Sequence, residues 1–493
     1  MKPGILATAT VLGGWAAVTL LTSACTVVGP DYQQPALSLP ATFQEPAAAA
    51  AAATRPAAAD WPVRWWTQFQ SPALNTLVER ALAQNPGIEA GQAALRVAAE
   101  AVRAQEGLYQ PQVSAGYTFA RSKTGSALAS PLSSADYVFN LHTLALNVSL
   151  TPDVFGLNHR TVESLQAQAD SQRHLLEATR ASLAANVVVA VVTEAGLREQ
   201  LQVTEALLRS QQSLLDAQRR LRAAGALGEA DVRAQELVVA TTDATLPPLQ
   251  KLLGQQRDLL KNLLGAYPDE VLGATFHLSD LSLPATLPQT LPSSLLERRA
   301  DLRAAEESLH AASAAIGVAR ANRLPQVVLG TSVIGQAGTV FADLFRSAGT
   351  FWTLAGGIAG PVFDGGTLSA RERAARAAYD QAAAMYRQAV LAAFQSVADA
   401  LVATQTDQEA LVRQQRAKEA AERSLAIAQK QKALGDLPAV ALLPLEQASL
   451  QAQLTLAQIR ANQFADVAAL CLALGGGWEA MASPTTAALS GTH

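Results

Sequence analysis

The sequence predicts an α+β membrane protein in which each chain supplies four β-strands and two long helical hairpins. Two observations predict it: an internal duplication, and a switch within each half from strand-like to helical periodicity. Four strands are too few to close a barrel in a membrane, so several copies have to share one wall. The duplication pairs residues 210 positions apart: Gly225 with Gly435, Glu236 with Glu446, and Leu264-Gly265 with Leu474-Gly475.

Composition narrows the class of protein. The chain has 493 residues and a net charge of −4, with no long basic run, which argues against nucleic acid as a partner. Aromatic residues make up only 5%, and alanine is abundant, a composition that favours long helices packed through small side chains. Beyond the N-terminus no apolar run reaches the ~20 residues of a membrane-spanning helix, so we expect any crossing to be a closed barrel.

The N-terminus predicts a lipid anchor. Lys2 and an apolar stretch lead to the small residues Ser23 and Ala24 and then to Cys25. This pattern indicates a signal peptide over residues 1–24, removed before a Cys25 that is acylated. Thr22 stands where an aliphatic residue is usual, and ordinary cleavage after Ala24, which leaves a free thiol, is the alternative.

The domain organisation follows from the duplication. We expect each half to fold as helices, two strands and a long hairpin, with flexible segments around the halves. The predicted order is signal peptide 1–24, lipid-anchored tether 25–60, first repeat 61–268, linker 269–290, second repeat 291–478 and flexible tail 479–493.

Period-two alternation predicts the strands, at 112–122 and 137–150 and again at 326–338 and 350–363. In the second of these, Leu144 and Leu146 alternate with Ala145 and Asn147. An apolar face opposite a small or polar face suits a barrel wall between lipid and water. A four-stranded soluble sheet is the alternative.

Two very long helices are predicted from about 158 to 223 and from about 368 to 433, each spanning roughly 100 Å. Leucines seven residues apart and four-three spacings indicate coiled-coil seams along these helices and along the returning helical stretch of the second half. Cys471 falls on such a seam and is expected to be a small buried filler. The seam residues are Leu201, Leu208 and Leu215; Val390, Phe394, Val397 and Leu401; and Leu450, Leu454, Ala457, Ala461, Phe464, Ala468 and Cys471.

Each long helix is expected to end at a glycine, Gly225 or Gly435, where the chain reverses into a hairpin tip. At the second tip we predict an apolar gate. The residues of this candidate gate are Val440, Leu442 and Leu443, with Asp231 and Asp436 nearby. Simple packing of the hairpin is the alternative role for the leucines.

Several stretches resemble the TolC-like outer membrane factors, the lipid-anchored outer-membrane efflux proteins of tripartite RND-type systems that include NodT-like lipoproteins. Residues 25–35 are similar to the start of the mature family members, and residues 291–299, Leu-Pro-Ser-Ser-Leu-Leu-Glu-Arg-Arg, carry the most specific match. Ala300 stands where the family usually has proline. The sequence of residues 362–366, Val-Phe-Asp-Gly-Gly, is also typical of the family.

The resemblance implies a homotrimer whose twelve-stranded outer-membrane barrel continues into a coiled-coil periplasmic tunnel. It implies a passive exit duct for small molecules such as drugs, working with a periplasmic membrane-fusion adaptor and an inner-membrane pump of the RND type. Outer-membrane lipid would surround the barrel. The outer-membrane duct of a type I protein secretion system and a non-conducting trimeric scaffold are the alternatives.

The hairpin tips are also the expected contact with the adaptor. Cations at helix C-termini are favoured by the helix dipole in any case, and that role alone could explain the basic residues. The candidate docking residues are Arg219, Arg220, Arg222 and Gly225 on the first tip and Lys430, Lys432 and Gly435 on the second.

No enzyme is predicted. The histidines, among them His142, His159 and His174, show no metal-ligand spacing, and there is no phosphate-binding loop. We therefore expect no catalytic residue, no cofactor and no metal site.

Overall fold

The computed structural model describes residues 27–35, 64–125, 137–283 and 299–476. The predicted signal peptide, Cys25 and the tail 479–493 lie outside the described residues, as do most of the tether and part of the linker. The chain divides into two compact units, and each draws on both halves of the sequence. The sheet unit takes described residues from 27–35, 94–173 and 304–387, and the hairpin unit takes the others.

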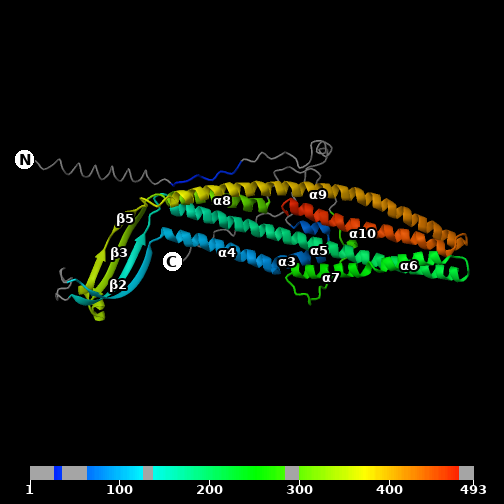
Figure 1. The fold of residues 1–493 in the computed structure, drawn as a ribbon, viewed down its shortest axis with the longest axis horizontal. Coiled ribbons are helices and arrows are strands. Elements are labelled where there is room, and N and C mark those ends of the chain that lie inside the picture. The colour runs from blue at the N-terminus through cyan, green and yellow to red at the C-terminus, as the bar shows by residue number, and fades with distance from the viewer. Residues whose placement is uncertain (1–26, 36–63, 126–136, 284–298, 477–493) are drawn as a thin grey trace, which may run out of the picture. The chain divides into compact units, whose positions relative to one another are not determined.

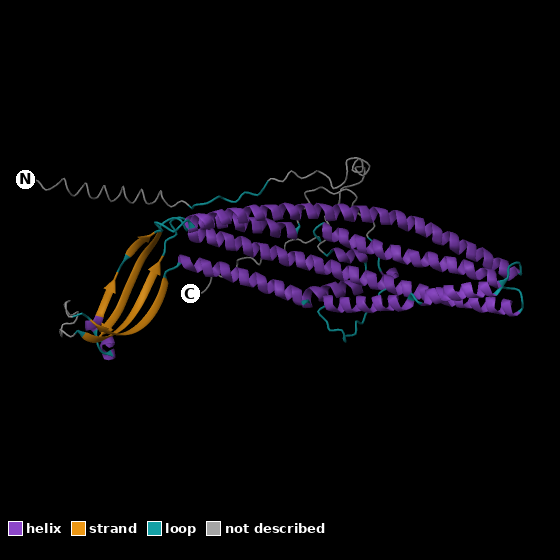
Figure 2. Ribbon diagram, viewed as in Figure 1, coloured by secondary structure: helices purple, strands orange, loops and turns teal. Residues whose placement is uncertain are grey.

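The sheet unit contains one antiparallel sheet, drawn in orange in Figure 2. Among the described residues β1 pairs only with β2, and β4 and β5 pair only with β3, so both outer edges of the sheet are open. The strands are β1 (Gln112–Lys123), β2 (Val138–Leu150), β3 (Gln326–Gly338), β4 (Thr350–Thr353) and β5 (Gly356–Ala359).

The predicted fourth strand, 350–363, is wrong in two respects. It is broken into β4 and β5, and it ends at Ala359. The break lies opposite a bulge in β3, where the three residues 330–332 face the two residues 354–355. A bulge inserts one unpaired residue and interrupts the ladder of hydrogen bonds, which divides the partner strand.

The helices cover most of the remaining described chain. The long helices match the predicted bounds within one residue, because glycines stand at or near both of their ends. Figure 1 labels the elements, which are α3 (Pro72–Gln84), α4 (Pro86–Glu106), α5 (Leu157–Ala223), α6 (Glu229–Asp243), α7 (Leu246–Leu263), α8 (Ala300–Ala321), α9 (Thr367–Leu434) and α10 (Leu442–Ala473).

Short 3₁₀ segments join these elements. They are η1 (Trp65–Phe69), η2 (Gly107–Tyr109), η3 (Leu278–Asp280), η5 (Phe341–Phe345), η6 (Ser347–Gly349) and η7 (Ala439–Ala441). In the hairpin unit Trp65 and Phe69 of η1 are fully buried, and the Phe69 ring lies 6.0 Å from the Phe464 ring of α10. The aromatic start of the folded chain therefore packs against its last helix.

The predicted seams are buried over most of α9 and over most of the second half of α10, from Ala457 to Cys471, and least on α5. Val397 of α9 and Ala468 and Cys471 of α10 are buried, and burial raises the pKa of the Cys471 thiol to about 12. On α5 Leu215 is buried as predicted, but Leu201 and Leu208 are only half-buried. The buried stripe there also includes Thr204, Leu207, Gln211 and Leu214. Leucine spacing alone misses this seam because a threonine and a glutamine occupy two of its positions.

The returning arms of the two hairpins differ. In the second hairpin α10 is continuous, whereas in the first the arm is divided into α6 and α7 at Thr245. Pro247 and Pro248 follow, and a proline lacks the N–H that a helix interior requires. One window of α5 has a mean hydropathy of 1.6, and 56% of that window is buried inside the chain. By composition this window is apolar enough to span a membrane, which the sequence expectation did not include.

Candidate functional site

The two hairpin tips share one backbone design. At the first tip the N–H of Gly225 donates to the carbonyl of Arg222 at 2.9 Å, and the N–H of Ala226 to that of Leu221 at 2.9 Å. At the second tip the N–H of Gly435 donates to the carbonyl of Lys432 at 3.0 Å, and the N–H of Asp436 donates to that of Gln431 at 2.9 Å. This is the Schellman motif, which needs a left-handed residue, and Gly225 and Gly435 have φ values of +79° and +85°. Figure 1 shows both tips at the same end of the hairpin unit.

The side chains of the first tip are charged. Arg219 contacts Glu236 at 3.0 Å, and Arg222 contacts Glu229 at 3.2 Å. Arg233 then joins both carboxylates, with distances of 3.2 Å to Glu229 and 2.8 Å to Glu236. Hydrogen bonds from Arg219 and Arg233 lower the pKa of Glu236. Two of the candidate docking arginines therefore already bind carboxylates across their own hairpin.

The second tip is apolar at the candidate gate, although Lys432 and Glu446 stand where the first tip has Arg222 and Glu236. Val440, Leu442 and Leu443 are half-buried within one chain, whereas Asp436 and, on the first tip, Asp231 are exposed. Leu434, the last residue of α9, is 78% exposed. The remaining candidate docking residues, Arg220, Lys430 and Lys432, are exposed as well.

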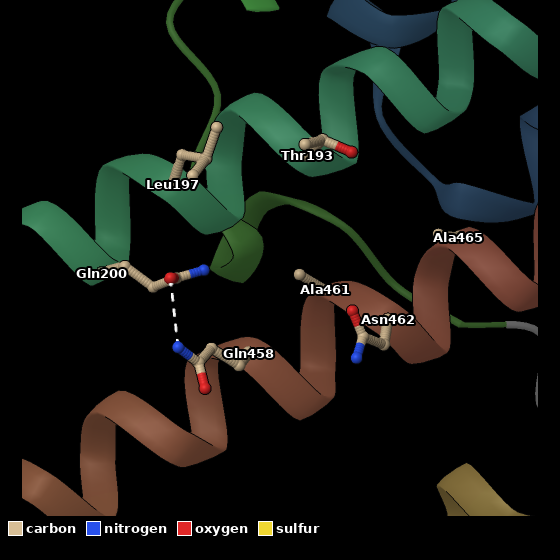
Figure 3. Close-up of a pocket in the computed structure, with 7 residues that line it drawn as sticks. All are labelled: Thr193, Leu197, Gln200, Gln458, Ala461, Asn462 and Ala465. Atoms are coloured by element: carbon tan, nitrogen blue, oxygen red, sulfur yellow. Dashed lines mark hydrogen bonds between the residues drawn. The ribbon is translucent and has the colours of Figure 1, made fainter. Parts of the chain in front are cut away.

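Two long helices of the hairpin unit approach each other closely, and a small cavity lies beside the contact. A Cβ atom on Gly196 of α5 would lie 2.7 Å from the Cβ of Ala461 of α10. The cavity beside it measures about 290 Å³ and is lined by Leu197 and by small and amide side chains, with the Gln458 amide donating to Gln200 at 3.3 Å (Figure 3). Its lining holds no charged side chain, so it lacks the groups that would bind an ion selectively.

A carboxyl pair lies elsewhere in the hairpin unit, between α9 and α10. Burial raises the pKa of Asp407 to about 6, and the neighbouring carboxyl of Asp466 contributes to the shift. Among the described residues, no three His, Cys, Asp or Glu side chains come together as a metal site.

The sheet has two chemically different faces. One cross-strand row joins Ala115, Leu146, Ile334 and Trp352, and on this face Ile334 and Trp352 are 54% and 73% exposed. The adjacent row on the opposite face joins residues 116, 145, 335 and 351, three of which are glycine or alanine. An exposed apolar face opposite a face of small residues matches a wall between lipid and a pore.

His142 lies on the same face of the sheet as Leu144 and Leu146, which is the apolar face. It stands opposite Phe119, and its ring nitrogen lies 2.8 Å from the hydroxyl of Tyr117. Together with Phe341 these rings form an aromatic cluster toward the loop end of the strands. Aromatic residues at strand ends are typical of the membrane–water interface.

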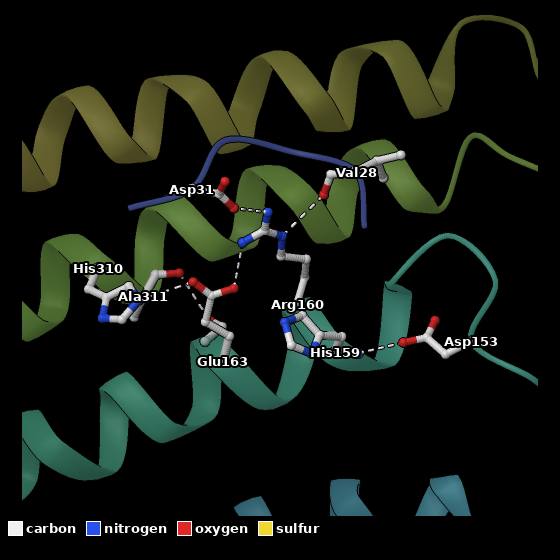
Figure 4. A network of polar contacts seen from close by, with 9 residues as sticks. Val28, Asp31, Asp153, His159, Arg160, Glu163, His310 and Ala311 are labelled. Carbon is white, nitrogen blue, oxygen red and sulfur yellow. Dashed lines mark hydrogen bonds and ion pairs between the residues drawn. The ribbon is translucent and has the colours of Figure 1, made fainter. Parts of the chain in front are cut away.

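The segment that follows the predicted lipidation site is held against the sheet unit (Figure 4). Arg160, with only 5% of its side chain exposed, contacts Asp31 and Glu163 at 2.7 Å each and donates to the carbonyl of Val28 at 3.2 Å. Gly29 at φ +109° lies so close to Gly317 of α8 that a Cβ atom would be 2.5 Å from its Cα. A buried guanidinium and a close contact that only glycine allows therefore help to fix the segment, together with the stacking of Tyr32 on His310 at 4.4 Å.

The start of α9 holds the opposite arrangement. Glu372, with 11% of its side chain exposed, accepts from Arg320 at 3.1 Å and Arg376 at 2.9 Å and also pairs with Arg323. These three guanidiniums lower the pKa of Glu372 to about 2. The sequence analysis did not single out this cluster or Arg160, because Asp31 lies 129 residues from Arg160, and Arg320 and Arg323 lie 52 and 49 residues from Glu372.

Comparison with known proteins identifies the family of this chain. A sequence model of the family described as "Outer membrane efflux protein" matches residues 77–266 and again residues 291–476. The chain therefore belongs to the outer membrane efflux protein family, and it is an outer-membrane channel component of an efflux system. The family and the fold are those of export ducts rather than of enzymes.

Individual relatives extend over nearly the whole chain. The pyoverdine export outer membrane protein OpmQ of Pseudomonas putida is 30% identical over 86% of this chain and 89% of its own length. The toluene efflux pump outer membrane protein TtgF of Pseudomonas putida is 29% identical over 96% and 98%. The solved structure of the outer-membrane channel OprN is 30% identical and superposes with a TM-score of 0.79 over 92% of this chain and 99% of that one.

Proposed function

We propose that three copies of this chain close a twelve-stranded barrel in the outer membrane and form a passive exit duct for small molecules. The open edges of the sheet carry this proposal. β1 and the β4–β5 strand each present an unpaired row of backbone groups, which cannot remain unpaired in lipid. Pairing β1 of one copy with β4–β5 of the next removes every edge, and three copies supply twelve strands.

The two faces of the sheet then acquire their roles. The exposed apolar face, with Ile334 and Trp352, contacts outer-membrane lipid, and the face of small residues lines the pore. A scaffold without a pore would not need a face of small residues. Relatives named for pyoverdine and for toluene share this architecture, so the duct accepts what its pump delivers.

At the hairpin tips the duct meets a periplasmic adaptor and, through it, an inner-membrane pump, which we propose to be of the RND type. The exposed cations Arg220, Lys430 and Lys432 are the groups free to contact the adaptor. Arg219 and Arg222 contribute by fixing the shape of the first tip. Cross-linking that traps the adaptor on the sheet unit and never at the tips would contradict this assignment.

The closed end of the duct is apolar. Val440, Leu442 and Leu443, half-buried in one chain, meet their counterparts from the other copies, and a ring of such side chains gates by excluding water. Acylation of Cys25 adds a lipid anchor just before the segment that Arg160 holds. Fatty-acid labelling that persists in a Cys25→Ala variant would rule out this anchor.

The direct test is assembly followed by conductance. The purified chain in detergent should have the mass of a trimer by light scattering and should give discrete channels in a planar lipid bilayer. A well-ordered monomer that dissolves in buffer without detergent would overturn the proposal. A deletion strain tested against drugs, dyes, solvents and metals would then define the substrates.

A further inference from the structure

The most exposed apolar side chains of the sheet unit lie in the loop between β5 and α9. Val362 is 101% exposed and Phe363 is 92% exposed. Two adjacent apolar side chains that bury nothing in their own chain indicate a surface that another molecule covers. The corresponding loop of the first half, between β2 and α5, is covered: Val28 donates to the carbonyl of Phe155 at 3.2 Å, and Val27 packs against Gly156.

The strand order determines what comes next to this loop. β5 is an open edge that ends at Ala359, and β1 is the opposite open edge and begins at Gln112. The pairing of Gln112 with Ser149, of Leu150 with Leu329 and of Gln326 with Ala359 places these two ends on the same end of the sheet. In an antiparallel junction between copies, the chain after Ala359 therefore runs beside the chain before Gln112.

The residues before Gln112 supply a matching apolar pair. Leu108 and Tyr109 of η2 are 50% and 42% exposed. When Ala359 of one copy is placed opposite Gln112 of the next, counting outward from these two residues brings Tyr109 opposite Val362 and Leu108 opposite Phe363. We propose, as a consequence of the trimer put forward above, that Val362 and Phe363 of one copy pack against Tyr109 and Leu108 of the next and lock the base of the barrel.

The charges around the two pairs are complementary. Asp153 and Glu106 lie close enough to Tyr109 to raise its pKa, after the larger effect of burial. Asp364 follows Val362 and Phe363, and the charge of Arg323 contributes to lowering the pKa of Asp364, after the larger effect of backbone hydrogen bonds. Arg323 forms an ion pair with Glu372, as Arg320 and Arg376 also do. Three guanidiniums against the two carboxylates of Glu372 and Asp364 leave one positive charge in excess, so a basic apolar patch meets an acidic apolar patch.

The experiment is a cross-link between two differently tagged chains. One chain carries Val362→Cys, the other carries Tyr109→Cys, and a short bismaleimide is added to the purified, co-expressed trimer. We expect a covalent heterodimer on a denaturing gel. The matched control replaces Tyr109→Cys by Val97→Cys, an exposed α4 residue twelve positions earlier, and the parent chain controls for Cys25 and the buried Cys471.

The outcomes separate this inference from the proposed function. A trimer of the correct mass whose heterodimer yield equals that of the Val97→Cys control overturns the contact and leaves the duct intact. A Val362→Cys chain whose new thiol reacts only with a lipid-soluble maleimide assigns the loop to lipid and also overturns the contact. Failure to form any trimer contradicts the proposed function itself.

A charge exchange provides a second readout. Arg323→Glu should raise the dissociation constant of the trimer roughly tenfold, an effect of the size expected for close charge pairs at interfaces. Glu106→Arg on the same chain should bring the dissociation constant back toward that of the parent. Arg416→Glu, at an exposed position of α9 far from the cluster, controls for a general effect of charge. Loss of trimer that Glu106→Arg does not repair contradicts the charge complementarity.

Discussion

The two places where a strand of this protein turns into a long helix carry inverted charge arrangements. At the start of α5 one guanidinium, Arg160, is shared by the carboxylates of Asp31 and Glu163. At the start of α9 one carboxylate, Glu372, is shared by three guanidiniums. The first junction is covered by the chain's own segment 27–35. At the second junction Val362 and Phe363 are fully exposed.

This difference teaches how a duplicated chain assigns separate tasks to its halves. The backbone is kept, as the paired glycines of the tips show, but the side chains diverge. The first half satisfies its charges internally, with an ion-pair network at the tip and a covered junction. The second half leaves apolar groups exposed at both places, where the proposed assembly needs contacts between copies.

The largest effect is expected from Arg160→Ala. Removing a side chain that is only 5% exposed leaves Glu163 without its closest partner and releases Asp31, at a cost on the order of 3 kcal/mol of stability. Hydrogen exchange should show residues 27–35 losing protection while α9 keeps it. Unchanged protection of residues 27–35 would show that contacts other than the Arg160 guanidinium hold the segment.

Glu372→Gln tests the second junction, with an expected loss of about 1–2 kcal/mol at neutral pH because the partly exposed arginines are screened. The pKa of Glu372 is lowered from 4.5 to about 2, so its stabilisation is fully present above pH 4.5 and disappears as the pH falls toward 2. The thermal midpoints of variant and parent should converge over that range. A difference that does not change with pH would contradict the charge cluster.

At the tips, Leu443→Ala and Arg233→Ala are a matched pair, because the two residues lie 210 positions apart at equivalent places. We expect Leu443→Ala to raise the basal bilayer conductance roughly tenfold, which corresponds to about 1.4 kcal/mol lost from the closed state. Arg233→Ala, in an exposed ion-pair network, should leave conductance close to that of the parent. Equal conductance in both variants would contradict the assignment of the gate to the second tip.

The smallest effect is expected from alanine at the two tip glycines. No atom lies within 4 Å of a Cβ added to Gly225 or Gly435, so only the positive φ opposes the substitution. Each change should cost about 1 kcal/mol, and the two costs should be equal within error in thermal unfolding. A clearly larger cost at one tip would show that the shared backbone is under different constraints in the two halves.

Several elements could be predicted from the sequence because their causes are local. The ends of α5 and α9 follow from glycines whose left-handed conformation stops a helix, and Cys471 is buried as its seam position indicates. The α5 seam was misplaced because Thr204 and Gln211 occupy core positions without apolar side chains. The break between β4 and β5 could not be predicted, because its cause is a bulge in β3.

The sequence by itself determined the period of each segment, the glycine stops, the duplication and the family, since these depend on residue type and spacing along the chain. Only the tertiary structure decided which half is covered. Folding brings together residues that are far apart in the chain, and two ion pairs form in this way: Asp31 with Arg160, and Arg323 with Glu372. The spacing of residues along the sequence does not indicate such contacts. The exposure of Val362 and Phe363 was decided in the same way, because burial depends on what else the fold places beside them.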